Sequence, residues 1–254
     1  STCRNIYHNL ALEDWIHAHH DFSDNQTLLL LWRNEPCVVI GRHQNPWAEC
    51  DVRRCEEQKV EVARRKSGGG SVYHDLGNLN CSFFTNKRKY NRLMNLELIA
   101  DALASTWGLD VTVSPRDDLL LNKEYKASLI SGTAAKLGSK VAYHHCTLLF
   151  NTDMNPLNKL LQSSVLGLRS KATESVRSPV KNLQVVEPAI NYESLVQAIS
   201  AQYWQYCGAQ VLLLLHHPQY VDPTSEPMHP GIHKMYTEIK QWQWIYGKTP
   251  KFSI

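Results

Sequence analysis

The sequence predicts an α+β fold in which helices pack on a mixed, largely antiparallel sheet. Short apolar runs of strand length are interspersed with hairpin-like turns and helical segments, in no strict βαβ order. Apolar residues make up 43% of the 254 residues, which suffices for a packed core. No apolar run approaches the ~20 residues that a membrane-spanning helix needs. The chain therefore suits one large domain or two small ones.

The first half of the chain combines helical periodicity with short apolar runs. Leu12, Trp15 and Ile16 fall on one face of a helix. The continuous apolar runs are typical of buried strands. In chain order, the expected elements are a helix over 9–20, strands over 27–33 and 37–40, an amphipathic helix over 47–59, a strand over 60–64 entering a glycine-rich loop, and a strand over 72–85 leaving it.

The second half opens on the strongest helical pattern, in which Leu93, Leu96, Ile99 and Leu103 repeat at intervals of three and four. A polar turn at 122–124 then separates two apolar segments, as in a hairpin. In chain order, the expected elements are a helix over 91–107, a strand over 109–113, a hairpin of 118–121 with 125 onward, a strand over 141–150, helices over 157–161 and 192–206, and a proline-rich loop over 216–231.

Charge and cysteine content exclude several classes of protein. A net charge of +3 does not by itself favour a nucleic-acid partner. The seven cysteines form no C-x-x-C pair, and their odd number indicates free thiols in a reducing compartment. The twelve histidines lack metal-ligand spacing. We expect a monomer without a metal site that binds neither nucleic acid nor a membrane.

The stretch from Arg64 to Asn80 carries the clearest chemical signal. Its three consecutive glycines, Gly68–Gly70, expose backbone N–H groups, permit positive φ and let an anion come close. Two arginines just upstream supply positive charge with forked donors. Neither G-x-G-x-x-G nor G-x-x-x-x-G-K-[ST] is present. The stretch predicts a phosphate or adenylate cradle, and a flexible surface loop is the alternative.

The whole stretch resembles the lipoate–protein ligase and lipoyltransferase family. The family signature Arg-Arg-x-Ser-Gly-Gly-Gly-x-Val-x-His-Asp-x-Gly-Asn-x-Asn is matched at every fixed position. Residues 41–45 resemble a second family segment that helps to bind the acyl-adenylate. Tyr73, Cys146 and the ending 242–252 are most similar to animal mitochondrial lipoyltransferases. The resemblance covers the chain from its first helix onward and implies the fold shared by biotin and lipoate protein ligases.

The resemblance also implies an activity. Lipoyl-AMP is a mixed anhydride, and a lysine of a partner protein attacks its carbonyl while AMP leaves. We therefore expect transfer of a lipoyl or octanoyl group, from lipoyl-AMP or an acylated carrier protein, to lipoyl domains of 2-oxoacid dehydrogenase E2 subunits and to the glycine-cleavage H protein in the mitochondrial matrix. The alternatives are a ligase that uses ATP and Mg²⁺, and a non-catalytic domain that binds lipoyl-AMP or a carrier. No covalently bound cofactor is expected.

One family motif departs from the pattern. In Lys-Ile/Val-Ser-Gly-x-Ala, the lysine bridges the carbonyl and phosphate oxygens of the adenylate. Here residues 130–134 match, but Leu129 precedes them and the nearest upstream lysine is Lys126. Three extra strand residues would span ~10 Å and reverse the side-chain face. Either a bulge or loop returns Lys126 to the site as the expected catalytic residue, or the cation is lost; Lys136 is another candidate.

Other positions complete the expected site. Asp118 matches an acidic family position, and His74 is either a hydrogen-bonded structural residue or a base. The segment 144–149 is similar to one beside the acyl tunnel of the family, with core packing as the alternative. The expected substrate-binding residues are Arg42, Asn45, Arg65, Ser67, Gly68, Gly69, Gly70, Val72, His74, Asn78 and Asp118.

The resemblance also predicts the domain organisation. Residues 1–240 are expected to form the catalytic domain, and 241–254 the start of a linker to an accessory C-terminal domain absent from this chain. In the family, that domain matters most for making the adenylate from ATP, so transfer without activation is expected. The sequence does not separate a lipoyl from an octanoyl donor, because both present an apolar tail to a tunnel.

Overall fold

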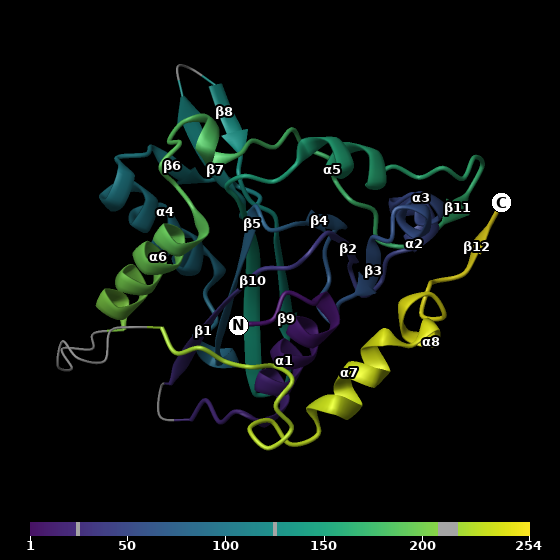
Figure 1. Ribbon diagram of the computed structural model, residues 1–254, viewed down its shortest axis with the longest axis horizontal. Helices are drawn as coiled ribbons and strands as arrows, with labels where there is room; N and C mark the ends of the chain where they lie inside the picture. The colour runs from purple at the N-terminus through teal and green to yellow at the C-terminus, as the bar shows by residue number, and fades with distance from the viewer. Residues whose placement is uncertain (24–25, 124–125, 208–217) are drawn as a thin grey trace.

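The computed structural model describes residues 1–23, 26–123, 126–207 and 218–254, so Tyr125 and residues 216–217 of the expected elements lie outside it. Its centre is a four-stranded antiparallel sheet (Figure 1). The continuous apolar run of its edge strand pairs in register with apolar residues of the next strand, as in Leu29 opposite Phe83. In spatial order, the strands are β1 (Thr27–Trp32), β5 (Asn78–Asn86), β10 (Val141–Leu149) and β9 (Thr133–Leu137).

Two three-stranded sheets and one short pair complete the β-structure. One sheet joins β2 to β3 in parallel and to β4 antiparallel, and the other is an antiparallel sheet of β6, β7 and β8. A mixed, largely antiparallel architecture is thus confirmed. The strands are β2 (Cys37–Ile40), β3 (Glu61–Arg64), β4 (Val72–His74), β6 (Val111–Val113), β7 (Leu119–Lys123), β8 (Lys126–Leu129), β11 (Arg169–Ser170) and β12 (Phe252–Ser253).

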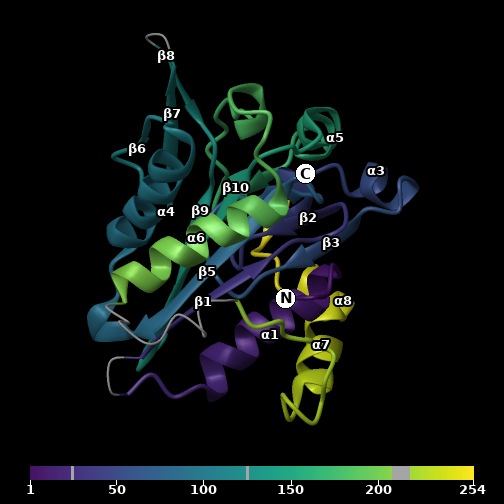
Figure 2. The same ribbon diagram turned by 60° about the vertical axis from the view of Figure 1, so that its left-hand side comes forward.

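Helices cover the sheets in two groups, which Figure 2 shows on different sides of the strands. In one group α1 (Ile6–His19) packs against α7 (Ile232–Lys240), and in the other α4 (Arg92–Trp107) packs against α6 (Tyr192–Tyr206). Each group of helices packs on its own hydrophobic cluster. Both clusters include residues from strands of the central sheet. The seven cysteines are free thiols, as expected. Among the described residues no helix is long and apolar enough to cross a membrane.

The helix expected over 47–59 is two short helices, α2 (Pro46–Glu49) and α3 (Val52–Glu57). Asp51 makes the break, because its Oδ1 accepts a hydrogen bond from the backbone N–H of Arg54 at 3.0 Å and so caps the second helix. The other short helices are α5 (Met154–Leu160), α8 (Trp242–Ile245) and 3₁₀ turns over Lys87–Lys89 and Leu183–Val185.

The strand expected over 72–85 is also divided, because a tight turn separates β4 from β5. The backbone N–H of Gly77 donates to Asp75 Oδ1 at 2.9 Å, which closes an Asx turn. A Cβ at Gly77 would collide with the backbone of Asn151. The turn therefore carries the chain from the β2 sheet into the central sheet. As a result, the glycine loop and β5 lie on two different sheets that face each other.

Arg64 fastens the end of the chain to this framework. Its buried guanidinium donates to the carbonyl oxygens of Trp244 at 3.1 Å, Ile245 at 2.8 Å and Gln44 at 2.8 Å. In return, the Trp244 indole N–H donates to the carbonyl of Arg64 at 2.7 Å. Residues expected to begin a linker at 241 are thus packed on the domain as far as Thr249, which accepts from Arg64 Nη2. That an accessory domain follows stays a prediction.

Candidate functional site

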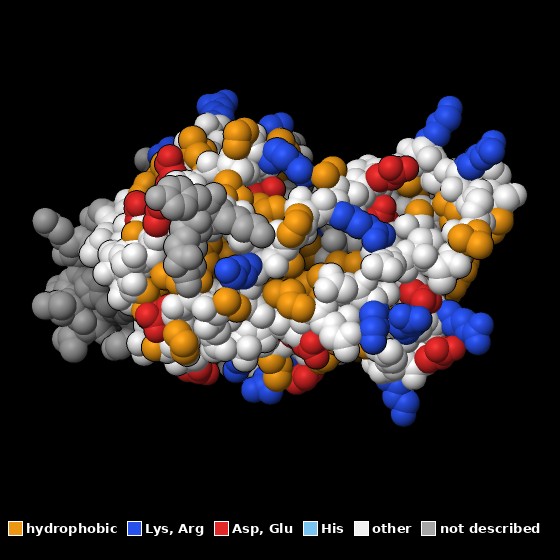
Figure 3. Space-filling view, turned by 90° about the horizontal axis from the view of Figure 1, so that it is seen from above, with side chains coloured by type: hydrophobic (Ala, Val, Ile, Leu, Met, Phe, Trp, Pro, Cys, Tyr) orange, Lys and Arg blue, Asp and Glu red, His pale blue; other side chains and the backbone are white. Residues whose placement is uncertain are grey.

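A cavity of about 530 Å³ opens between the central sheet and the β2 sheet. This volume suits a small-molecule ligand. From above, apolar side chains border a hollow in the middle of the molecule, with arginine and lysine side chains around it (Figure 3). The glycine loop, β4, β8, the start of β9, β10 and the irregular segment 173–180 supply most of the lining.

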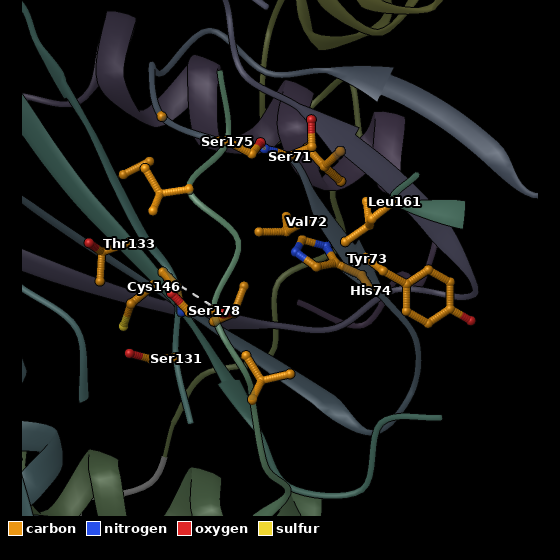
Figure 4. Close-up of a pocket in the computed structure, with 18 of the residues that line it drawn as sticks. Ser71, Val72, Tyr73, His74, Ser131, Thr133, Cys146, Leu161, Ser175 and Ser178 are labelled. Atoms are coloured by element: carbon orange, nitrogen blue, oxygen red, sulfur yellow. Dashed lines mark hydrogen bonds between the residues drawn. The ribbon is translucent and has the colours of Figure 1, made fainter. Parts of the chain in front are cut away.

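The cavity brings together part of the predicted site. Six of the expected substrate-binding residues line it, and they come from the glycine-rich stretch after β3, from β4 and from the position just before β7. They are Arg65, Gly69, Gly70, Val72, His74 and Asp118. Burial raises the pKa of Asp118. Figure 4 shows Val72 and His74 directed to one side of β4 and the Tyr73 ring directed to the other.

The remaining expected residues stand behind the wall or beside the cavity. Asn45 Oδ1 caps α2 by accepting from the Trp47 N–H at 3.0 Å. Asn78 is fully buried and donates to Asn80 Oδ1 at 3.2 Å. Ser67 is buried beneath the loop. Five of the predicted residues do not line the cavity, and their contact with the substrate stays a prediction: Arg42, Asn45, Ser67, Gly68 and Asn78.

The backbone of the glycine loop requires glycine at one position. Gly69 has φ +85°, the left-handed region that L side chains rarely adopt. A Cβ there would lie 3.0 Å from Arg65 Nη2 and 3.2 Å from Ala134 Cβ. The loop also packs tightly against Gly41, where a Cβ would collide with the Gly69 carbonyl oxygen. The backbone of the loop therefore leaves little room for a side chain at Gly41 or Gly69, and its role as an anion cradle stays a prediction.

Arg65 holds the loop in this shape. Its buried guanidinium donates to the carbonyl oxygens of Gly70 at 2.7 Å and Val39 at 3.2 Å, and its Nε donates to Ser67 Oγ at 3.0 Å. Burial lowers its pKa to about 10, so it stays charged at neutral pH. Arg65 is one of the predicted substrate-binding residues, and that role stays a prediction. Its hydrogen bonds within the loop and to β2 indicate that it also stabilises the fold.

Arg65→Ala should therefore lower the melting temperature as well as weaken adenylate binding. Loss of a charge-assisted contact and of the loop geometry should weaken binding of lipoyl-AMP by roughly ten- to a hundredfold. Calorimetric binding and thermal unfolding on the same preparation measure the two effects. Arg53→Ala is a matched control, since Arg53 is exposed and its one ion pair among the described residues is with Glu57 of the same helix. A normal melting temperature in Arg65→Ala would contradict the structural role.

Segment 173–178 lies over the glycine loop, and the sequence offered no signal for it. Ser175 Oγ accepts hydrogen bonds from the Ser71 N–H at 2.7 Å and from Gln44 Nε2 at 3.0 Å, and Figure 4 shows Ser175 beside Ser71. The Ser175 hydroxyl in turn donates to the Glu49 carboxylate. Gln44, in the turn after β2, thereby joins the loop to this segment. An irregular polar stretch of this kind has no periodicity, so only the fold places it here.

Two acidic residues of α1 support the opposite wall. Glu13 accepts from Ser82 Oγ at 2.6 Å and pairs with His145 Nδ1 at 2.9 Å, and His145 lines the cavity. Burial opposes ionisation of Glu13, but the charge and hydrogen bond of His145 outweigh it and leave the pKa of Glu13 lowered. Asp14 pairs with Lys66 and Lys136, each at 3.2 Å. Lys136, the other candidate for the catalytic cation, is thus engaged with Asp14.

The expected catalytic residue, Lys126, begins β8. The β7–β8 pairing runs in continuous register from Leu120 opposite Leu129 to Lys123 opposite Lys126, so the described pairs contain no bulge. The Lys126 side chain lies outside the described residues, and its role stays a prediction. Leu129 itself lines the cavity, at the position that the family motif gives to lysine.

The remaining wall separates a polar mouth from an apolar interior. Exposed Arg116, Glu174 and Arg177 stand at the mouth, whereas Leu10 and Trp32 form part of the buried wall. No group of His, Cys, Asp and Glu in the described part of the chain has the arrangement of a metal site. The site can therefore hold a ligand that joins an anionic group, beside the loop, to an apolar tail.

These features define an α+β protein with the fold of lipoate-protein ligases and a ligand-sized cavity between its sheets. The chain belongs to the family described as lipoyl protein ligase A/B catalytic domain, whose model matches residues 5–204. The resemblance seen in the sequence is thereby confirmed.

Three relatives place the chain within this family. It is 48% identical over its whole length to Lipoyl amidotransferase LIPT1, mitochondrial, of Homo sapiens, and spans 66% of that protein. It is 38% identical over 249 residues to Lipoate-protein ligase A of Bdellovibrio bacteriovorus, covering 98% of this chain and 71% of that one. The structure of P. falciparum LipL1 in complex with lipoate superposes with a TM-score of 0.79 at 29% identity, covering 98% of this chain and 73% of the other.

Proposed function

We propose that this chain, as a monomer in the mitochondrial matrix, transfers a lipoyl or octanoyl group to a lysine of lipoyl-domain proteins, namely E2 subunits and the H protein. One observation carries the proposal: a single cavity joins the glycine loop to an apolar, buried wall. The similarity to mitochondrial lipoyl amidotransferases supports lipoyl as the acyl group and mitochondria as the location. The donor is lipoyl-AMP or an acylated carrier, and ATP with Mg²⁺ is needed only by a full ligase.

Each part of the cavity has a task in this reaction. The loop at Gly69 and Gly70 faces the phosphate, and the buried wall takes the acyl tail and excludes water from the anhydride. The acceptor amine attacks the carbonyl carbon, the C–N bond forms, the bond from that carbon to the phosphate oxygen breaks, and AMP leaves as the amine loses a proton. We propose Lys126 as the cation that stabilises charge on the carbonyl and phosphate oxygens.

A second function has its own support. Leu129 occupies the cavity wall where the family motif has lysine, and β8 is regular up to Lys126. A chain without that cation would still bind lipoyl-AMP or an acylated carrier. A non-catalytic adenylate-binding domain is therefore the alternative.

Mass spectrometry of an apo lipoyl domain incubated with the chain tests these functions. A gain of one lipoyl group with lipoyl-AMP, and none with lipoate, ATP and Mg²⁺, is expected. A gain in both reactions would indicate a ligase. Binding of lipoyl-AMP without any gain would indicate the non-catalytic domain. A lipoyl domain whose acceptor lysine is replaced by methionine controls for modification at other lysines.

A further inference from the structure

The hydrogen bonds behind His74 determine which of its ring nitrogens carries the proton. Asn9 Nδ2 faces two backbone carbonyl oxygens, those of Cys3 at 3.0 Å and Arg33 at 3.2 Å, which only accept. The same nitrogen donates to Asn34 Oδ1 at 2.9 Å, so the Asn34 amide nitrogen faces His74 Nδ1 at 2.9 Å. Nδ1 must therefore accept, and the ring proton sits on Nε2.

The Nε2–H group of His74 has no hydrogen-bond partner within the described structure. The side chain is 3% exposed and lines the cavity. Burial, with the nearby charges of Arg65 and His145, lowers the pKa of His74 to about 3. The ring is therefore neutral at pH 7 and holds one buried, unpaired donor in the wall of the cavity.

This donor lies in the buried part of the cavity. Trp32 is 1% exposed, meets the His74 ring edge-on at 6.1 Å between centroids and lines the same cavity. Val72 and His74 share one face of β4, so His74 lies ~7 Å beyond Val72 along the strand, in the direction away from the glycine loop. With the phosphate beside that loop, the distal end of an acyl tail is the part of the ligand that comes to His74.

We propose that the His74 Nε2–H donates a hydrogen bond to a sulfur of the lipoyl dithiolane ring, so that the cavity selects lipoyl over octanoyl. The inference rests on the proposed function and specifies its acyl group. Each sulfur of the dithiolane disulfide is divalent and is a weak acceptor, whereas an octanoyl tail offers none. A site built around a buried donor disfavours an analogue that leaves the donor unpaired.

Three adenylates separate hydrogen bonding from shape: lipoyl-AMP, octanoyl-AMP and the adenylate of 5-cyclopentylpentanoic acid, whose ring has carbon in place of both sulfurs. Calorimetric titration of the unmodified chain should show lipoyl-AMP binding roughly five- to thirtyfold more tightly than the cyclopentyl adenylate, the range expected for one weak buried hydrogen bond. Equal affinities would overturn the inference and leave the proposed function intact. Binding of none of the three would instead remove the proposed function.

Variants at His74 assign the preference to this side chain. His74→Leu removes the donor and should abolish the difference between lipoyl-AMP and the cyclopentyl adenylate. His74→Gln keeps an N–H near the Nε2 position and should retain part of it. A preference that persists in His74→Leu, or equal weakening of all three adenylates, would assign the contact to another group or to the acyl carbonyl and overturn the inference. If His74→Leu does not fold, the titration of the unmodified chain decides.

Discussion

Replacing Gly69 by valine is expected to abolish binding of lipoyl-AMP. At φ +85° a β-branched residue is strained, at a cost of roughly 1–2 kcal/mol or more. The Cβ of the new side chain would already lie too close to Arg65 Nη2 and Ala134, and the two Cγ atoms would add to the crowding. The loop must then change shape, and the carbonyl oxygens that hold Arg65 move with it. Because the loop is exposed to the cavity on one side, the rest of the fold should persist.

Calorimetric titration with lipoyl-AMP, together with thermal unfolding, measures the outcome. Gly68→Ala is the matched control, because a Cβ there would meet no heavy atom within 4 Å. Gly70→Val should also impair binding, since its Cβ would lie 2.9 Å from Ser175 Oγ, the acceptor for the Ser71 N–H. Normal affinity in Gly69→Val would remove the assignment of this loop as the anion cradle.

The fold followed closely from local patterns in the sequence. The helix α4 and the strands β1, β2 and β10 lie within about two residues of their expected ranges, because apolar periodicity and length determine such elements. The expected elements omitted β9, α7 and α8, and two expected elements were divided, at Asp51 and Asp75. In both places a carboxylate caps or turns the chain inside a run that otherwise favours one element. Such local hydrogen bonds compete with the pattern and are invisible to it.

The site could be predicted only in part, because a sequence shows which donors exist but not what they bind. The glycine loop was identified from the sequence. The sequence did not show that the Arg65 guanidinium donates hydrogen bonds to that loop, or that Asn45 caps a helix. The orphaned donor on His74 depends on two asparagines far away in the chain, Asn9 and Asn34. Ser175 is far from the loop in the sequence and contacts it only because the folded chain brings the two segments together. These contacts join segments whose spacing in the sequence carries no periodic signal.

Lys126→Ala is expected to slow transfer from lipoyl-AMP by roughly 10²–10³-fold, the loss typical of removing one electrostatic stabiliser. Negative charge on the carbonyl and phosphate oxygens grows toward the transition state, so the rate should fall more than the affinity. With β8 regular, the backbone of Lys126 is three strand residues, ~10 Å, from Leu129 in the cavity wall. If Lys126 is the catalytic cation, strand β8 must therefore change position when substrate binds.

A lysine at position 129 supplies the matched comparison, because Leu129 already lines the cavity. If Lys126 is the catalytic cation, the double variant Lys126→Ala with Leu129→Lys should recover most of the lost rate. Deleting residues 127–129 should preserve or raise activity, since it restores the family spacing. Lys136→Ala should cost much less, because Lys136 pairs with Asp14. Single-turnover transfer to an apo lipoyl domain measures all four. An inert parent chain, made active by Leu129→Lys or by the deletion, would show that Lys126 does not reach the site and that the chain is a binding domain.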